Sequence, residues 1–372
     1  MGRTRNRILQ RAGTVICMSA VNRQIRLAAR PHGEVAPTDW EHIDAPAPEP
    51  GPGQFAARTL AVSLDPAMRG WLDDRPSYVP PVGLGDVMRA NTLVEVTASQ
   101  NERFAVGDHV VGLFGVQTHV VSDGRGVLKV DLDAASAATW LGALGMTGMT
   151  AYFGLLDVGA AKEGDTVCVS GAAGAVGSVV GQIARIKGCR TIGIAGGPEK
   201  CALLTGELGF DVAIDHRAQD VRRALGEAAP DGVDVYFDNV GGEILDAALA
   251  NLAMHARVVI CGAISQYNND GPQRGPANYM ALLVRRARME GFLVLDYADR
   301  WKQAMGEIAG WIREGRLTSK EHIVTGTIDD FPDTLQMLFR GDNVGKLILE
   351  LRQPAASNAG ASSPAGTGRP SR

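Results

Sequence analysis

The stretch Thr-Val-Cys-Val-Ser-Gly-Ala-Ala-Gly-Ala-Val-Gly-Ser at residues 166–178 decides the fold. A buried strand, residues 166–169, runs into glycines spaced G-x-x-G-x-x-G, and a helical pattern follows over residues 176–187. A glycine-rich turn at such a junction lets backbone N–H groups and the helix N-terminus approach a pyrophosphate, because larger side chains would block the approach. The spacing therefore predicts a dinucleotide-binding loop. The alternative is a tight turn kept small for packing.

The pattern of strands and helices continues downstream of this loop. Apolar runs at residues 191–194, 233–237 and 257–260 predict further strands, with helices expected at residues 199–208 and 301–313. Strands that alternate with helices indicate βαβ units, so this part of the chain is predicted to be α/β with a parallel sheet.

The first third of the chain has a different character. Between residues 23 and 130, short apolar runs such as 24–27, 92–96 and 109–113 are broken by Gly and Pro, which favours a compact β-rich domain. A last strand is expected at residues 347–351, and it need not belong to the parallel sheet. With 372 residues the chain exceeds the size at which one core stops growing, so two domains are expected.

Charge and cysteine content exclude several classes of protein. Lys and Arg (37) nearly balance Asp and Glu (41), so nucleic-acid and membrane-surface partners, which require a basic patch, are not expected. No run approaches the roughly 18 apolar residues of a membrane span. The five cysteines are scattered without a Cys-x-x-Cys pair, which indicates reduced thiols in a cytoplasmic protein.

Both ends of the chain are expected to lie outside the folded domains. Residues 1–18 contain four Arg and no acid, and we interpret them as an extension ahead of Met18, with a targeting peptide as the alternative. Residues 353–372 are rich in Ala, Ser, Gly and Pro and have no aromatic side chain, which is typical of a disordered tail.

The end of the second predicted strand distinguishes between the two nicotinamide cofactors. NAD sites place an acid about 20 residues beyond the glycines to hold the ribose 2′-hydroxyl. Here the sequence is Ile-Ala-Gly-Gly-Pro-Glu-Lys at residues 194–200, where no acid ends the strand and Lys200 can attract a 2′-phosphate. We therefore expect NADPH, with Glu199 pointing away. The alternative for Lys200 is an ordinary solvated lysine.

A catalytic zinc is not expected. Such a site requires cysteine and imidazole ligands near one another. The N-terminal part has His32, His42, His109 and His119, but no cysteine lies between Cys17 and Cys168. The sequence therefore predicts no metal site.

Five motifs resemble one family. Residues 107–112 (Gly-Asp-His-Val-Val-Gly), the loop 171–177 and residues 236–242 (Tyr-Phe-Asp-Asn-Val-Gly-Gly) resemble the medium-chain dehydrogenases/reductases. Residues 261–268 (Cys-Gly-Ala-Ile-Ser-Gln-Tyr-Asn) and 341–346 (Gly-Asp-Asn-Val-Gly-Lys) resemble its zinc-independent branch of prostaglandin reductase (leukotriene B4 12-hydroxydehydrogenase), plant double-bond reductases and bacterial curcumin reductase. The resemblance extends from about residue 19 to residue 351.

This resemblance implies an architecture and a cofactor site. A doubly wound Rossmann NADP-binding domain (138–314) is inserted in a GroES-like, β-rich catalytic domain (19–137 plus 315–352), and homodimers are common in the family. His216 stands where the family often has a tyrosine near the adenosine phosphate. The implied cofactor contacts are Gly171, Gly174, Ala175, Val176, Gly177, Lys200, His216, Asn239, Cys261, Gly262, Ala263, Ile264, Ser265, Tyr267, Phe292, Leu293, Val294 and Asn343.

The resemblance also implies an activity, namely an NADP-dependent oxidoreductase acting on CH–CH groups that transfers hydride to the C=C bond of α,β-unsaturated aldehydes and ketones. Without zinc, a hydrogen-bond donor must stabilise the enolate, and Tyr267 is the catalytic candidate, either donating the proton or only the hydrogen bond. Tyr78 is a candidate for the substrate cleft, with an ordinary surface loop as the alternative. Met68, Arg69 and Trp71 suit either the cleft wall or domain packing. The alternatives are an NADPH quinone oxidoreductase and a non-enzymatic NADPH-binding protein.

Overall fold

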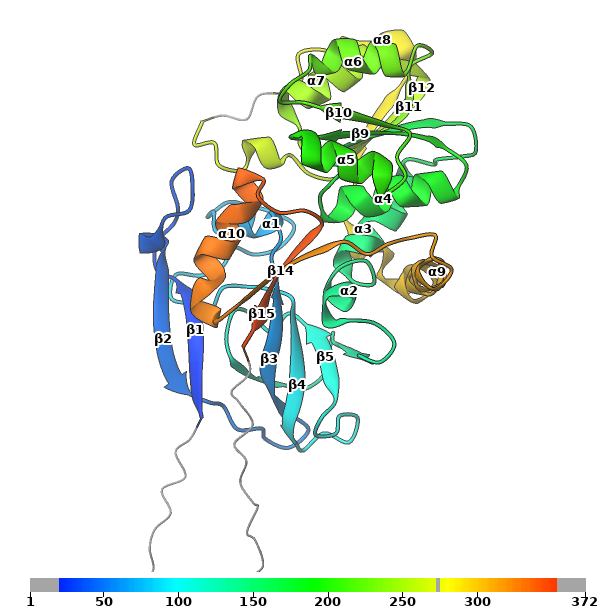
Figure 1. The fold of residues 1–372 in the computed structure, drawn as a ribbon. Helices are drawn as coiled ribbons and strands as arrows, with labels where there is room; N and C mark the ends of the chain where they lie inside the picture. The colour runs from blue at the N-terminus through cyan, green and yellow to red at the C-terminus, as the bar shows by residue number, and fades with distance from the viewer. Residues whose placement is uncertain (1–19, 272–274, 353–372) are drawn as a thin grey trace, which may run out of the picture.

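The structure, a computed structural model, describes residues 20–271 and 275–352 (Figure 1). The N-terminal extension and the disordered tail expected from the sequence, residues 1–18 and 353–372, lie outside the described residues. The described chain forms a six-stranded, a seven-stranded and a two-stranded sheet. Within these ranges, no helix is long and apolar enough to cross a membrane.

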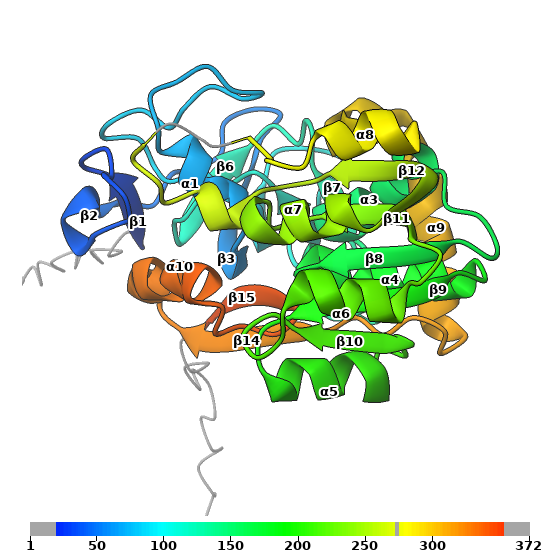
Figure 2. The same ribbon diagram turned by 90° about the horizontal axis from the view of Figure 1, so that it is seen from above.

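The six-stranded sheet is parallel throughout and has the strand order β10-β9-β8-β11-β12-β13. Figure 2 shows its strands side by side, from β12 through β11 and β8 to β10. The strands predicted at residues 166–169, 191–194, 233–237 and 257–260 are confirmed as β8, β9, β11 and β12, and the sheet also contains β10 and β13. The bounds of the six strands are β8 (Thr166–Ser170), β9 (Arg190–Ala195), β10 (Val212–Asp215), β11 (Val233–Asp238), β12 (Leu252–Ile260) and β13 (Arg288–Gly291).

Helices cover both faces of this sheet because successive side chains of a strand point to opposite faces. Val167 and Val169 of β8 pack in one cluster with α3, α4, α5 and α9, whereas Cys168 between them packs in another cluster with α6, α7 and α8. The predicted helix at residues 301–313 is confirmed with the same bounds. The helices are α3 (Met146–Phe153), α4 (Ala175–Ile186), α5 (Pro198–Gly206), α6 (Val221–Ala228), α7 (Gly242–Ala250), α8 (Met280–Arg285) and α9 (Trp301–Arg313).

The seven-stranded sheet takes its strands from both ends of the described chain. β15 pairs antiparallel with β3 and parallel with β14, so the predicted last strand is confirmed and lies outside the parallel sheet. β1 (Val21–Leu27) and β2 (Trp40–Pro46) form the separate hairpin. The seven strands are β3 (Phe55–Ser63), β4 (Thr92–Ser99), β5 (His109–Gly112), β6 (His119–Ser122), β7 (Leu128–Val130), β14 (Glu321–Gly326) and β15 (Lys346–Leu351).

The parallel sheet is thus inserted in a β-rich part, which confirms the predicted fold class. The chain leaves the β-rich sheet through α2 (Ala137–Leu141) after β7 and returns to it at β14. Two further helices, α1 (Ala67–Trp71) and α10 (Phe331–Arg340), pack in the core of this part. The domain boundaries at residues 137/138 and 314/315 stay predictions.

The strand order also fixes where a ligand can bind. From β8 the chain proceeds to β9 and β10 on one side, and then crosses to β11, β12 and β13 on the other. In such doubly wound sheets the crevice forms at the carboxyl ends of the strands where the order reverses, which here are β8 and β11.

Candidate active site

A cavity of about 630 Å³ lies at that crevice. Residues that follow five successive strands of the parallel sheet line it, namely Gly171, Gly196, His216, Asn239 and Cys261. Residues of the β-rich part complete the lining, among them Leu64, Asp65, Pro66, Ala67, Trp71, Tyr78, Arg89, Asn91 and Leu113. The cavity is therefore a joint product of the two sheets.

The glycine loop after β8 forms one end of this cavity. Gly171 has a positive φ of 58°, and Gly174 precedes α4 without any side-chain cap on the helix N-terminus. A Cβ on Gly177 would lie 2.4 Å from the carbonyl oxygen of Gly171, so packing alone requires this glycine. A Cβ on Gly174 would lie 3.1 Å from the same oxygen, at the wall of the cavity. An uncapped helix N-terminus at a cavity wall suits a pyrophosphate.

Three basic side chains gather beyond the end of β9. Lys200, His216 and Arg217 all line the cavity, whereas Glu199 is exposed and is not among the lining residues. A Cβ on Gly196 would lie 2.8 Å from His216 Nε2 and 2.9 Å from Arg217 Nε, so the glycine leaves room for both side chains. The three basic side chains therefore line the same part of the cavity.

The electrostatics of these groups suit a phosphate. The Lys200 ammonium donates a hydrogen bond of 2.8 Å to the carbonyl of Gly341. Burial lowers the pKa of Lys200, and the neighbouring Arg217 cation lowers it further, with Asp342 opposing. Burial and Arg217 also lower the pKa of His216. Basic groups whose pKa values are lowered by burial and by a neighbouring cation are stabilised in their charged form by an added anion.

A buried carboxylate organises the loops after β8 and β11. Asp238 is 1 % exposed, and its Oδ1 accepts hydrogen bonds from Ser170 Oγ at 2.9 Å, from Tyr236 Oη at 3.0 Å, and from the N–H groups of Val240 at 3.1 Å and Gly241 at 3.0 Å. Burial raises the pKa of Asp238, while these donors oppose the rise. Asp238 belongs to the motif at residues 236–242, but the motif alone does not indicate this role.

Asn239 is fixed by the same network. Its backbone N–H donates to Ser170 Oγ at 2.9 Å, and its Nδ2 donates to the Ser170 carbonyl at 2.7 Å. The N–H groups of Cys261 and Gly262, after β12, donate to the Asp238 carbonyl at 2.9 and 3.1 Å. The ends of three neighbouring strands are thereby tied together beneath the cavity.

Tyr267 lies in the loop that this network positions. Its phenolic oxygen accepts a hydrogen bond of 3.2 Å from the N–H of Ala263, and a Cβ on Gly262 would lie 2.9 Å from that oxygen. Burial raises the pKa of Tyr267, although the N–H of Ala263 opposes the rise. Among the described residues, the phenolic O–H has no acceptor. Tyr267 is therefore a neutral hydrogen-bond donor that lines the cavity.

Most of the residues named from the sequence meet in this one cavity. Ala263 does not line it, but its N–H contacts the Tyr267 hydroxyl. Asn343 lines it, and its Nδ2 donates to the carbonyl of Gly345 at 2.9 Å. The other named residues in the lining are Gly171, Gly174, Ala175, Val176, Gly177, Lys200, His216, Asn239, Cys261, Gly262, Ile264, Ser265, Tyr267, Phe292, Leu293, Val294 and Tyr78.

Met68 and Arg69 require a correction, because the structure places neither in the cavity lining. Met68 is fully buried in the core of the β-rich part. The guanidinium of Arg69, which is 2 % exposed, donates to the carbonyl of Gly33 at 3.0 Å and to Asp73 at 2.7 Å. Both side chains belong to the packing of α1, which is the other role that the sequence suggested.

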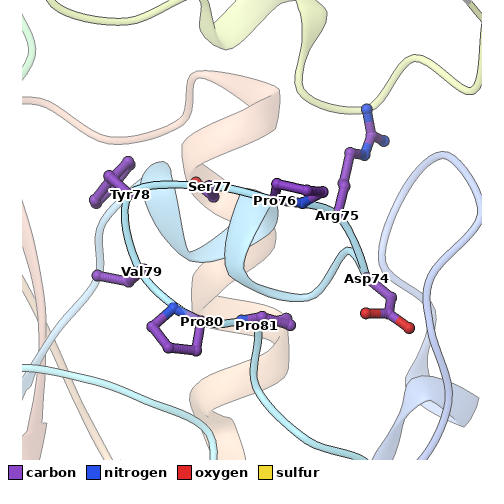
Figure 3. Close-up of a pocket in the computed structure, with 8 residues that line it drawn as sticks. All are labelled: Asp74, Arg75, Pro76, Ser77, Tyr78, Val79, Pro80 and Pro81. Atoms are coloured by element: carbon purple, nitrogen blue, oxygen red, sulfur yellow. The ribbon is translucent and has the colours of Figure 1, made fainter.

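Tyr78 stands in the loop of residues 74–81, which has a pocket of its own of about 410 Å³ (Figure 3). Figure 3 shows Tyr78 and Val79 on one side of the loop and Asp74 and Arg75 on the opposite side. Tyr78 is 50 % exposed, and its hydroxyl accepts a hydrogen bond of 3.2 Å from Trp71 Nε1. Tyr78 and Val79 also line the large cavity, so this loop forms part of its rim.

Two lining residues had no signal in the sequence. Arg89 and Asn91 come from the β-rich part, where no short motif marks them as ligand-binding. Within residues 20–271 and 275–352, no group of three or more His, Cys, Asp or Glu side chains is placed to hold a metal ion.

The comparisons with known proteins agree with this geometry. Residues 23–130 match a family model described as the N-terminal domain of oxidoreductases, and residues 175–310 match one described as zinc-binding dehydrogenase. The chain is 41 % identical over 335 residues to the NADPH-dependent curcumin reductase of Escherichia coli, covering 89 % of this chain and 97 % of the relative.

Two further similarities extend over most of the chain. The chain is 40 % identical over 331 residues to mouse prostaglandin reductase 1, covering 86 % of this chain and 96 % of the relative. The crystal structure of CurA from Vibrio vulnificus in complex with NADPH superposes with a TM-score of 0.85 at 41 % identity, covering 89 % of this chain and all of that one. The resemblance identified from the motifs is thereby confirmed.

Proposed function

Because the chain belongs to the medium-chain dehydrogenase/reductase family, in the branch of curcumin and prostaglandin reductases, we propose that it is an NADPH-dependent reductase of C=C bonds conjugated to an aldehyde or ketone. The observation that carries this proposal is Tyr267, a neutral phenol in the same cavity as the glycine loop, with no acceptor for its O–H among the described residues.

The cavity fits NADPH. The uncapped N-terminus of α4 and Gly174 would hold the pyrophosphate, and Lys200 and Arg217 would hold the 2′-phosphate. Asn239 and the loop 261–267 would surround the nicotinamide half. When bound, NADPH supplies a hydride for the β-carbon of the enone.

Tyr267 then acts on the charge that develops on the substrate. Hydride addition at the β-carbon moves an electron pair to the carbonyl oxygen, and a proton must finally reach the α-carbon. A preorganised O–H donor aimed at this oxygen stabilises the enolate without reorganisation. Since burial raises its pKa, the phenol keeps its proton at neutral pH. The α-carbon is protonated by Tyr267 or by solvent.

The proposal is tested by following NADPH oxidation against a panel of alkenals, enones and quinones at equal concentration. Turnover of the alkenals and enones with a saturated carbonyl product supports it. Turnover confined to quinones would assign the protein to quinone reduction instead. Tight NADPH binding without turnover of any member would indicate a non-enzymatic protein.

We also propose that the protein forms a homodimer through the β13 edge of the parallel sheet. Among the described strands, β13 pairs only with β12. The neighbouring α8 exposes Met280, Leu283 and Val284 at 51, 70 and 65 %, with Tyr279 before it at 59 %. Apolar side chains beside an open strand edge favour association. Light scattering of the wild type and of Leu283→Asp should give a dimer and a monomer, respectively.

A further inference from the structure

The part of the cavity built by the β-rich residues has an unbalanced positive charge. Arg89 lines it, and among the described residues no carboxylate lies within ion-pair distance of the Arg89 guanidinium. The acid of this region, Asp65, is already neutralised, because its Oδ1 lies 2.6 Å from the Nζ of the buried Lys346. Its Oδ2 accepts a hydrogen bond from Ser63 Oγ at 2.6 Å. Asp65 is thus not a counter-ion for Arg89.

Arg89 is held in one orientation by its neighbours. Its Nη1 donates a hydrogen bond of 2.9 Å to the carbonyl of Pro80, and its Cζ lies 5.5 Å from the centroid of the Trp71 ring. Trp71 in turn donates through Nε1 to the hydroxyl of Tyr78 at 3.2 Å. The guanidinium is therefore positioned before any ligand arrives, which reduces the ordering cost of binding.

Most of the hydrogen-bonding capacity of Arg89 is unused. A guanidinium has five N–H donors in a planar fork, and in the described part of the chain only the bond to Pro80 engages one. Asn91, which also lines the cavity, has a side-chain amide without a partner among the described residues. A planar donor fork at the wall of a largely apolar cavity matches a carboxylate, which can accept two parallel N–H bonds.

We infer that Arg89 binds a carboxylate carried by the substrate away from the reacting double bond. The substrate class is therefore unsaturated aldehydes or ketones with an acidic tail. This inference rests on the proposed reductase function, because it concerns the far end of the same substrate. It makes Arg89 a specificity-determining residue, distinct from Tyr267 at the reacting carbonyl.

A purely structural role for Arg89 predicts something different. The bond to Pro80 could serve only to fasten the loop 74–81. In that case the loss of Arg89 would affect charged and uncharged substrates alike. The discriminating quantity is therefore the ratio of kcat/KM for two substrates that differ in the tail alone.

The experiment compares 2-nonenal with the matched acid in which the terminal methyl is a carboxylate, and with the methyl ester of that acid. A shorter pair, 2-hexenal and its matched acid, tests a second distance between the double bond and the carboxylate. The enzymes are the wild type, Arg89→Gln, Arg89→Met and Arg125→Gln. The last variant removes the same charge from a side chain that is 90 % exposed and does not line the cavity.

Both Arg89 variants should lower kcat/KM about tenfold or more for the acid of the better-fitting length. This change should come from a higher KM, with kcat unchanged. The alkenal and the ester should change less than about twofold, and Arg125→Gln should leave all ratios unaltered. Equal losses for acid, ester and alkenal, or no loss, would overturn the inference while leaving the reductase function intact. Failure of the wild type to reduce any of the substrates would instead refute the proposed function.

Discussion

The backbone N–H of Gly345 donates a hydrogen bond of 2.7 Å to the carbonyl of Ala173. This bond, together with the parallel bridge between Gly174 and Gly345, joins the glycine loop of the parallel sheet to the residue just before β15 of the other sheet. The proposed pyrophosphate site and the β-rich wall of the cavity are therefore positioned by one short segment.

Replacement of Gly345 by alanine should damage this connection. Gly345 has a φ of 68°, and a Cβ at this position would lie 2.0 Å from the carbonyl oxygen of Lys320. The backbone must move, so we expect a loss of stability of more than about 1 kcal/mol. The KM for NADPH should rise as well, because the glycine loop loses its anchor. Thermal unfolding and NADPH titration measure the two effects.

A glycine in an open position provides the control for this substitution. Gly306, in α9, is exposed, and a Cβ there would meet nothing within 4 Å. Gly306→Ala should be neutral or stabilising by up to about 1 kcal/mol, since alanine favours helix. If Gly345→Ala behaved like Gly306→Ala in both measurements, the proposed anchoring role would be wrong.

Lys200 should set the preference for NADPH over NADH. Lys200→Gln removes a cation from the group formed with His216 and Arg217, so the KM for NADPH should rise about tenfold or more while that for NADH stays nearly constant. The pKa of Lys200 is lowered, so NADPH binding should weaken at alkaline pH below the usual lysine range. Steady-state kinetics with both cofactors distinguish this effect from a general loss of stability, and Lys302→Gln, at an exposed side chain of α9, is the control.

Tyr267→Phe should reduce kcat for enones about 100-fold, because one donor to the developing enolate is lost. The binding of NADPH should be unchanged, since the ring remains in place. The raised pKa of Tyr267 also predicts that the wild type loses no activity through deprotonation of this phenol below about pH 10. Tyr279→Phe, at a side chain that is 59 % exposed, is the matched control. Unchanged turnover in Tyr267→Phe would show that the tyrosine only packs the loop.

The part of the site that depends on local sequence could be predicted. The Gly171–Gly177 spacing requires a strand before it and a helix after it, and the structure supplies β8 and α4 with nearly the expected bounds. The phosphate-binding role of Lys200 was predicted from its distance along the chain to this loop. Both signals depend on neighbours within one βαβ unit, where the chain path is nearly fixed by the alternation of strand and helix.

Features that depend on distant parts of the chain were not predictable. Arg89 reaches the cavity through its place just before β4 and its contacts with Trp71 and Pro80, and no sequence pattern predicts these contacts. Asp238 can hydrogen-bond to the residues that follow or end β8 and β12 only because these strands end beside β11. Met68 and Arg69 stand next to lining residues in sequence, but the turn of α1 directs them into the core.

Asp108 should contribute stability that is lost in acid. Lys129 Nζ lies 2.6 Å from Asp108 Oδ2, and the N–H of Ala105 donates to the same oxygen at 2.7 Å. The hydrogen bond from Lys129 and that from Ala105 lower the pKa of Asp108 against the effect of burial. A lowered pKa means that the unfolded chain binds more protons than the folded protein between the two pKa values. The contribution is therefore complete above the unfolded pKa of about 3.9 and disappears as the pH falls through the folded value.

The variants Asp108→Asn, Lys129→Gln and their combination measure this contribution. At pH 7 the wild type should be more stable than Asp108→Asn by up to about 1 kcal/mol, a modest difference because Lys129 is 54 % exposed. Denaturant unfolding between pH 7 and pH 3 should show the two curves converging as the pH falls below 4. The convergence should be smaller between Lys129→Gln and the double variant, since Lys129 is absent from both and the N–H of Ala105 still lowers the pKa of Asp108 in Lys129→Gln. A wild-type advantage over Asp108→Asn that stayed constant down to pH 3 would mean that the Lys129 pair does not hold the carboxylate in its charged form.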